Sequence, residues 1–154
     1  MLDNRVKELL NQQIAKEFYS AYLYLDFSNF YYDLELNGLK LKQDPKGFCF
    51  GLDAVFLSNY AKCEEGETVV DLCTGNGIIP VLLTAKIPAK KIYGVEIQED
   101  SFLRAQKNSK YNNLEDRVSF VNGDIKEAAT IFGAASFDVI TTNPPYMIGQ
   151  HGIS

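Results

Sequence analysis

The chain has 154 residues, 46% of them hydrophobic, so it can form one globular domain with a core but hardly two large ones. Its formal net charge is -5, from 15 basic and 20 acidic residues without a block of like charge, which argues against indiscriminate nucleic-acid binding. Three cysteines without Cys-x-x-Cys spacing and a single histidine indicate reduced thiols in a cytoplasmic protein without a zinc site. No stretch reaches the ~18 apolar residues of a membrane span and the charged N-terminus is unlike a signal peptide, so we expect neither membrane insertion nor export.

The first segment, residues 1–32, carries apolar side chains at helical spacing from Val6 onward, with Asp3 or Asn4 placed to cap its start. We therefore predict one long amphipathic helix. Within it, the stretch NQQIAKEFYSAYLYL resembles the first helix of ferritins. The resemblance implies that Glu17 stands where ferritins have an iron ligand.

A ferritin-type di-iron site at Glu17 would also need a Glu-x-x-His pair on another helix. The only histidine is His151, and Ile148 stands three residues before it, so this pair cannot form. We expect Glu17 to be a vestigial position without metal, and the apolar stripe of the helix to be packing surface.

A β-hairpin is predicted after Asp33, where LELNGLKLK alternates about an Asn-Gly turn. Pairing across this turn sets Leu34 opposite Leu41 on one face of the hairpin. The composition changes at the same point. We therefore expect two units, a ferritin-like helix over 1–32 and a partial α/β domain over 33–154.

From Glu67 the chain alternates strand-like and helix-like segments, which are TVVDL, IIPVLLTA, KIYGVE, SFLRAQKNSKYN, VSFVN, IKEAATIF and FDVITT. Such a βαβαβαβ series is typical of the α/β class, in which helices cover the faces of a doubly wound parallel sheet. We predict four parallel strands in the order 3-2-1-4, counted along the chain.

Glycines or polar residues follow each predicted strand. The first strand leads into DLCTGNG, residues 71–77, where Gly75 and Gly77 let the backbone turn tightly and approach a ligand closely. Glu96 closes the second strand, where nucleotide-binding folds keep a carboxylate for ribose hydroxyls. Ligands of open parallel sheets bind beyond the carboxyl ends of the strands. The residues at the four strand ends are Asp71, Glu96, Asp124 and Asn143.

These motifs stand in the order found in class I S-adenosylmethionine-dependent methyltransferases, which residues 33–154 resemble. The resemblance implies a Rossmann-like fold with S-adenosyl-L-methionine as cofactor. By that resemblance, the loop Gly75–Gly77, entered through Asp71, would face the methionine part of the cofactor. Glu96 would hold the ribose, and Asp124 would lie near the adenine.

Cys73 departs from this pattern, because it stands where the family often has its first glycine. A side chain at this tight turn is expected to disturb the loop of the cofactor site slightly. A catalytic role is disfavoured, since nothing nearby in sequence supplies a base or a positive charge that would make Cys73 a thiolate.

The stretch NPPY, Asn143 to Tyr146, suits the chemistry of an amine conjugated to a ring. Such an amine becomes a better nucleophile when acceptors hold its hydrogens and steer its lone pair. The Asn143 side-chain oxygen and a carbonyl in the Pro144-Pro145 turn could be these acceptors, while Tyr146 could stack on the planar substrate. In the family NPPY accompanies methylation of adenine amines, but also of glutamine side chains in proteins and of some guanine amines. The alternative is a proline-stiffened turn at a strand end.

The segment upstream, residues 37–62, closely resembles the start of tRNA (adenine-N6)-methyltransferases that modify the anticodon-loop region of a valine tRNA. The resemblance implies that the stretch Phe50-Gly51-Leu52-Asp53 closes over the cofactor, with Asp53 capping the helix that follows. Lys40, Lys42 and Lys46 form a local basic patch that is otherwise read as a solvated face.

The family normally has seven strands, so a four-stranded sheet is a C-terminally truncated version of its fold. The missing strands would lie beyond FDVITT, which leaves an exposed edge with unpaired backbone groups and an apolar face. We expect this edge, or the N-terminal helix, to promote self-association, and the helix is a candidate to cover the edge.

Three functions follow from these patterns. The first is methyl transfer from S-adenosylmethionine to the N6 amine of adenine in tRNA, with glutamine or guanine amines as alternatives within the enzyme class. The second is a truncated or fused fragment that binds the cofactor without turnover. The third is a ferritin-like helical association module.

Overall fold

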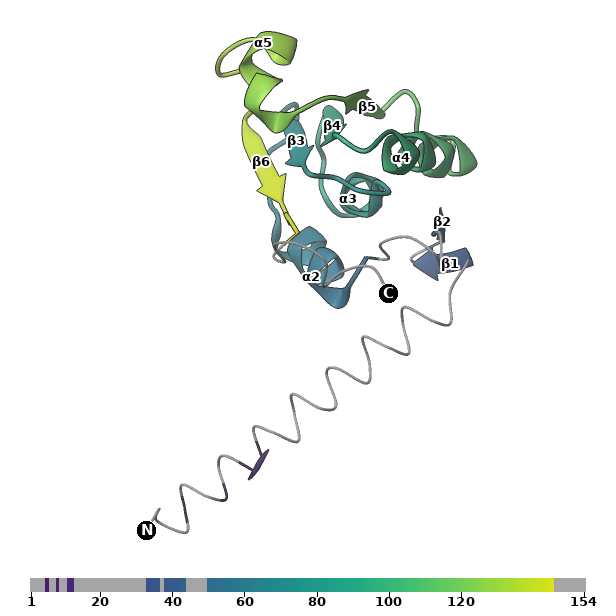
Figure 1. The fold of residues 1–154 in the computed structure, drawn as a ribbon, viewed down its shortest axis with the longest axis vertical. Coiled ribbons are helices and arrows are strands. Elements are labelled where there is room, and N and C mark those ends of the chain that lie inside the picture. Colours follow the sequence, from purple (N-terminus) through teal and green to yellow (C-terminus); the bar gives the residue numbers. More distant parts are fainter. Residues whose placement is uncertain are drawn as a thin grey trace.

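The computed structural model describes residues 5, 8, 11, 12, 33–36, 38–43 and 50–145 (Figure 1). The four described residues of the N-terminal segment are helical, as predicted there, and the rest of that prediction lies outside the described residues. The predicted positions Glu17, Lys46 and Tyr146 also lie outside them, as does the proposal that the N-terminal helix covers the edge of the sheet.

A four-stranded parallel sheet forms the centre of the domain (Figure 1). Its strands are β3 (Thr68–Leu72), β4 (Lys91–Glu96), β5 (Val118–Asn122) and β6 (Val139–Thr142). They lie in the order β5-β4-β3-β6 and all pair in parallel. This is the predicted order 3-2-1-4, so the predicted α/β class and topology are confirmed.

Helices connect the strands, as the alternating pattern predicts. They are α2 (Leu52–Tyr60), α3 (Ile78–Lys86), α4 (Glu99–Tyr111) and α5 (Ala128–Phe132), with a 3-10 turn η1 (Ile125–Glu127) before α5. Arg117 stabilises the end of α3, because its guanidinium donates hydrogen bonds to the carbonyls of Thr84 (2.9 Å) and Ala89 (3.1 Å). The Thr84 carbonyl lies in the last turn of α3, where carbonyls have no partner within the helix, and Ala89 belongs to the loop that follows.

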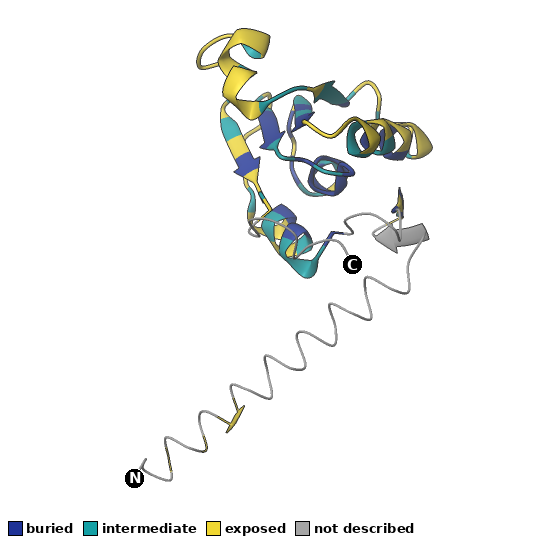
Figure 2. Ribbon diagram, viewed as in Figure 1, coloured by how far each residue is buried: buried dark blue, intermediate teal, exposed yellow. Residues whose placement is uncertain are grey.

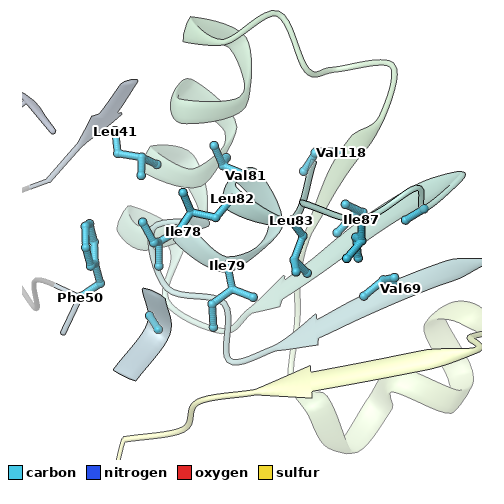
Figure 3. Packing of buried hydrophobic residues seen from close by; sticks show 13 residues of the cluster. Leu41, Phe50, Val69, Ile78, Ile79, Val81, Leu82, Leu83, Ile87 and Val118 are labelled. Carbon is cyan, nitrogen blue, oxygen red and sulfur yellow. The ribbon is translucent and has the colours of Figure 1, made fainter. Parts of the chain in front are cut away.

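The hydrophobic core lies between the sheet and α3, which is buried over most of its length (Figure 2). Figure 3 shows Leu83 and Ile87 approaching Val69 of the sheet, while Leu41 and Phe50 pack against the other side of α3. A helix that is apolar on all sides must be covered on several sides. Here α3 is in contact with α2, with the hairpin and with the sheet.

The predicted hairpin forms from β1 (Asp33–Leu36) and β2 (Leu39–Lys42), with Leu34 opposite Leu41 as expected. Two asparagines of α4 bind the backbone of β2 as a neighbouring strand would. Asn112 Oδ1 accepts from the Lys40 N–H (2.7 Å) and its Nδ2 donates to the Lys40 carbonyl (2.7 Å). Likewise, Asn108 Oδ1 accepts from the Lys42 N–H (2.8 Å) and its Nδ2 donates to the Lys42 carbonyl (3.1 Å). Lys40 and Lys42 lie on the same side of β2, and Asn108 and Asn112 lie on the same face of α4, so both pairs can bond at once. These hydrogen bonds attach the hairpin to the domain.

Among the described residues, fewer cover the opposite face of the sheet (Figure 2). There Tyr93, Phe132 and Phe137 make edge-to-face contacts, with ring centroids 5.0–5.6 Å apart. Among the described strands β6 is an edge strand, and its Ile140 is 62% exposed, as expected for an uncovered apolar face. Within the described residues, no helix is long and apolar enough to cross a bilayer.

Candidate active site

The four predicted strand-end residues lie at one edge of the sheet, because parallel strands end on the same side. The order along this edge is Asp124, Glu96, Asp71 and Asn143, which follows β5-β4-β3-β6. We call the loop 71–77 with Glu96 and Asp124 the cofactor rim. We call Asp53 with residues 143–145 the acceptor rim.

The two glycines of the loop have different surroundings. Gly75 and Gly77 both have positive φ, at 58° and 80°. A Cβ on Gly75 would meet no described atom within 4 Å, whereas a Cβ on Gly77 would lie 2.7 Å from Phe120 Cζ and 3.0 Å from Ala105 Cβ. Gly75 therefore leaves open space beside the loop. Gly77 allows the start of α3 to pack closely on Phe120 and Ala105.

Glu96 ties this loop to the end of β4. Its side chain is 7% exposed, and its two carboxylate oxygens accept hydrogen bonds from the N–H groups of Gly75 and Gln98, both at 2.8 Å. Hydrogen bonds between an ionised carboxylate and backbone N–H groups are strong, so Glu96 is held rigidly at the rim.

Asp71 is fully buried at the end of β3. Burial raises the pKa of its carboxyl to about 7, against the lowering effect of the Thr74 and Thr141 hydroxyls, and the charge of Glu96 raises it further. The Thr141 hydroxyl donates to Asp71 Oδ1 at 2.8 Å, while Oδ2 has no hydrogen-bond partner among the described residues. Thr141 carries no motif of its own. It could be identified only from the strand register, which places Thr141 opposite Asp71 on the neighbouring strand.

Cys73 keeps the conformation that a glycine would adopt, with φ at 59°. The left-handed region is strained for an L residue, so the loop keeps its tight turn at a cost in conformational energy. The pKa of the thiol is raised by burial and by the charges of Glu96, Asp71 and Asp124. The thiol is therefore protonated near neutral pH, which agrees with the prediction that Cys73 is not an activated nucleophile.

Asp124 is half-buried and caps η1, because its Oδ1 accepts from the Lys126 N–H at 2.9 Å. Together with Glu96 and Asp71 it surrounds the loop with acidic groups. Within the described residues, no group of three histidine, cysteine or acidic side chains is arranged to hold a metal ion.

In the acceptor rim, Asn143 Nδ2 donates a hydrogen bond of 2.7 Å to Asp53 Oδ2. The prediction that Asp53 caps α2 is wrong, since Gly51 is the N-cap and no described side chain makes a capping hydrogen bond there. Asp53 lies in the first turn of α2 and turns its carboxylate to Asn143 instead. Pro144 is half-buried and Pro145 exposed.

Phe50 is part of the hydrophobic core (Figure 3). Its N–H donates to Gln43 Oε1 at 3.0 Å, which fixes the chain between the hairpin and α2. The Phe50 ring therefore packs the hairpin onto α3, whereas Asp53 of the same stretch is hydrogen-bonded to Asn143.

A parallel sheet in this order, with a glycine loop after its first strand and a carboxylate closing the second, defines the class I S-adenosylmethionine-dependent methyltransferase fold. The chain belongs to the Methyltransferase small domain family, whose profile matches residues 52–153. Membership of this family identifies S-adenosyl-L-methionine as the cofactor.

Individual proteins show the same relationship. A provisionally named protein N5-glutamine methyltransferase of Methanocaldococcus jannaschii is 34% identical over 114 residues, which are 74% of this chain and 54% of that protein. A tRNA1(Val) (adenine(37)-N6)-methyltransferase of Proteus mirabilis is 32% identical over 97 residues, which are 62% of this chain and 38% of that protein. The chain thus spans about half or less of the length of these relatives.

Among solved structures, P. horikoshii TYW2 in complex with MeSAdo matches 62% of this chain and 36% of its own, with a TM-score of 0.53 and 27% identity. This match agrees with the α/β fold described above.

Proposed function

We propose that the cofactor rim binds S-adenosylmethionine and that the acceptor rim presents a planar amine to it, with the N6 amine of adenine in tRNA as the substrate. The observation that carries this proposal is the pairing of β3 with β6. Because the two strands are neighbours, the glycine loop at the end of β3 and the Asn-Pro-Pro turn at the end of β6 lie next to each other.

The residues of the cofactor rim fit this cofactor. Beside Gly75 there is space that no described atom fills, and the buried atom Asn76 Nδ2 has no hydrogen-bond partner in the described part of the chain. The acidic groups around the loop contribute, after burial, to the raised pKa of Cys73, and their negative potential would attract a ligand with a positive sulfonium and ammonium group. We propose that Glu96 binds the ribose and that Asp124 lies near the adenine.

The acceptor rim would hold and orient the amine. When bound, S-adenosylmethionine supplies an activated methyl group, so that a nitrogen–carbon bond forms while the sulfur–carbon bond breaks and the amine then loses a proton to solvent. Asn143 Oδ1 and the carbonyl of Pro144 accept the two amine hydrogens and direct the lone pair. Catalysis of this kind is mainly alignment, which needs no strong general base.

The substrate proposal has two candidates. Adenine in tRNA is supported by the resemblance of residues 37–62 and by the relative from P. mirabilis. The side-chain amide of a glutamine is supported by the relative from M. jannaschii, and it is also a planar NH₂ group that the same acceptors can hold. The exposed lysines Lys40 and Lys42 on β2 favour the first candidate, because they offer positive charge to phosphates on a chain that is acidic overall.

We also propose that the segment 1–32 is a separate unit from the methyltransferase domain at 33–154, and that the protein acts in the cytoplasm. The change of pattern at Asp33 supports this division.

The proposed function is tested with the whole chain. Calorimetry should show saturable binding of S-adenosylmethionine, and labelled methyl should pass to an unmodified valine tRNA transcript and not to a glutamine-containing peptide. Asn143→Ala should abolish transfer and leave cofactor binding within about twofold, because the acceptor rim acts on the amine. Absence of saturable binding at millimolar ligand would refute the proposal, and transfer to the peptide alone would reassign the substrate.

A further inference from the structure

We propose that Asp53 is a positioning residue, which holds the side-chain amide of Asn143 in the one orientation that presents its oxygen to the substrate amine. The inference rests on the proposed function, since it concerns the same acceptor rim. Asp53 is 90 positions from Asn143 in the chain, and the hydrogen bond of 2.7 Å between them joins the start of α2 to the end of β6.

An asparagine amide is planar and can face a site with either its oxygen or its NH₂ group. Only the oxygen accepts the hydrogens of an amine, so an amide rotated by half a turn would present donors to donors. With Nδ2 bound to the Asp53 carboxylate, Oδ1 lies on the other side of the amide. The reversed amide would bring two oxygens together, one of them charged. Asp53 therefore selects between two orientations that have nearly the same shape.

The carboxylate also strengthens the acceptor. A charge-assisted hydrogen bond to Nδ2 polarises the amide, and chains of hydrogen bonds reinforce one another inside a protein. Polarisation moves electron density onto Oδ1, which then binds more strongly to an amine as that amine becomes positive during transfer. The effect is greatest when charge develops, so it acts on the rate more than on substrate binding.

The surroundings of Asp53 favour this role over a purely structural one. Asp53 Oδ1 is buried and has no hydrogen-bond partner within the described ranges. An unsatisfied buried oxygen destabilises a fold, so stability alone does not explain a carboxylate here. The backbone that carries it is firmly held, because Ala54 and Ser58 of α2 are buried. The carboxylate is thus presented to Asn143 from a fixed position.

The test uses Asp53→Ala and Asp53→Asn in the whole chain, with Asp100→Ala as the matched control. Asp100 is an exposed acidic residue in the first turn of α4, so its removal costs the same helix-dipole interaction without touching either rim. We expect Asp53→Ala to lower kcat for methyl transfer to the tRNA transcript at least tenfold, with KM and the cofactor Kd within about twofold. Asp53→Asn should recover part of the rate, because its side-chain oxygen can still accept from Nδ2.

Two further readouts do not depend on activity. In nitrogen-15 NMR spectra, hydrogen exchange of the Asn143 side-chain amide should be at least tenfold faster in Asp53→Ala than in the wild type. The unfolding midpoint of Asp53→Ala in urea should stay close to that of Asp100→Ala, because both lose the helix-dipole interaction and the lost bond to Asn143 is offset by the removal of an unsatisfied buried oxygen.

The outcomes separate this inference from the proposed function. If the wild type binds no S-adenosylmethionine or transfers no methyl, the proposed function fails, and the amide exchange alone still decides whether Asp53 holds Asn143. If the wild type is active and Asp53→Ala keeps its kcat, the positioning role is refuted. A raised cofactor Kd with unchanged kcat would instead make Asp53 a cofactor contact and overturn the inference, as would unchanged amide exchange.

Discussion

The cofactor rim and the acceptor rim lie beside each other at the end of the same sheet, but they are built differently. The cofactor rim consists mainly of one loop between β3 and α3, and Glu96 fixes this loop through backbone hydrogen bonds. In the described part of the acceptor rim, a side-chain hydrogen bond joins Asp53 and Asn143, which are far apart in the chain. The first rim is thus tied to the stability of the domain, and the second can change with little effect on folding.

The largest effect is expected at Gly77. Gly77→Ala should lower the free energy of unfolding by roughly 4 kcal/mol, because strain at positive φ adds to overpacking against Phe120. Gly75→Ala is the matched control and should cost only about 1 kcal/mol, since its Cβ meets no described atom. Urea unfolding measures both. Equal losses would show that the two glycines do not differ as the structure indicates.

The second prediction concerns pH and Asp71. Its pKa is raised from 3.8 to about 7 in the folded protein, so folding favours the protonated carboxyl. The resulting stability is fully present below pH 3.8 and is lost as the pH rises through about 7. We expect this loss to be on the order of 3 kcal/mol, since relaxation around a buried group reduces the full effect. Asp71→Asn should remove this component from unfolding curves measured between pH 4 and pH 8. If Asp71→Asn keeps the pH dependence of the wild type, the loss of stability comes from a group other than Asp71.

The third prediction tests how the hairpin is attached to the cofactor rim. Asn108 is fully buried and binds the Lys42 backbone as well as the Asn76 carbonyl in the loop, at 2.9 Å. Asn108→Ala should cost roughly 2 kcal/mol and weaken cofactor binding, because buried backbone groups lose their partners. Asn112→Ala, at the more open end of the same contact, should cost about 1 kcal/mol and leave binding unchanged. If the two variants weaken cofactor binding equally, Asn108 has no special link to the loop.

The smallest effect is expected at Cys73. Cys73→Gly should raise the free energy of unfolding by about 0.5 kcal/mol, because the relief of strain at φ 59° is partly offset by the greater freedom of glycine in the unfolded chain. The increase should appear as a higher midpoint in urea. A clear loss of stability would mean that the Cys73 side chain packs favourably enough to outweigh its strained backbone.

The sequence predicts the cofactor rim better than the acceptor rim for a physical reason. Strand order follows from alternating patterns and short connections, and the carboxyl ends of parallel strands must meet, so Glu96 and the loop could be placed in advance. The partner of Asp53 could not, because its first-turn position in α2 suits a cap and nothing local indicates a contact 90 positions away. The packing role of Gly77 was also hidden, since it depends on Phe120 of a strand that follows much later.

The division of work between the two rims is tested most directly by calorimetric titration of S-adenosylmethionine into three proteins, the wild type, Glu96→Ala and Asn143→Ala. Saturable binding to the wild type should weaken at least tenfold in Glu96→Ala, because the variant loses the carboxylate that anchors the loop and that is proposed to bind the ribose. Binding to Asn143→Ala should stay within about twofold of the wild type. Equal weakening in both variants, or none in Glu96→Ala, would contradict the account.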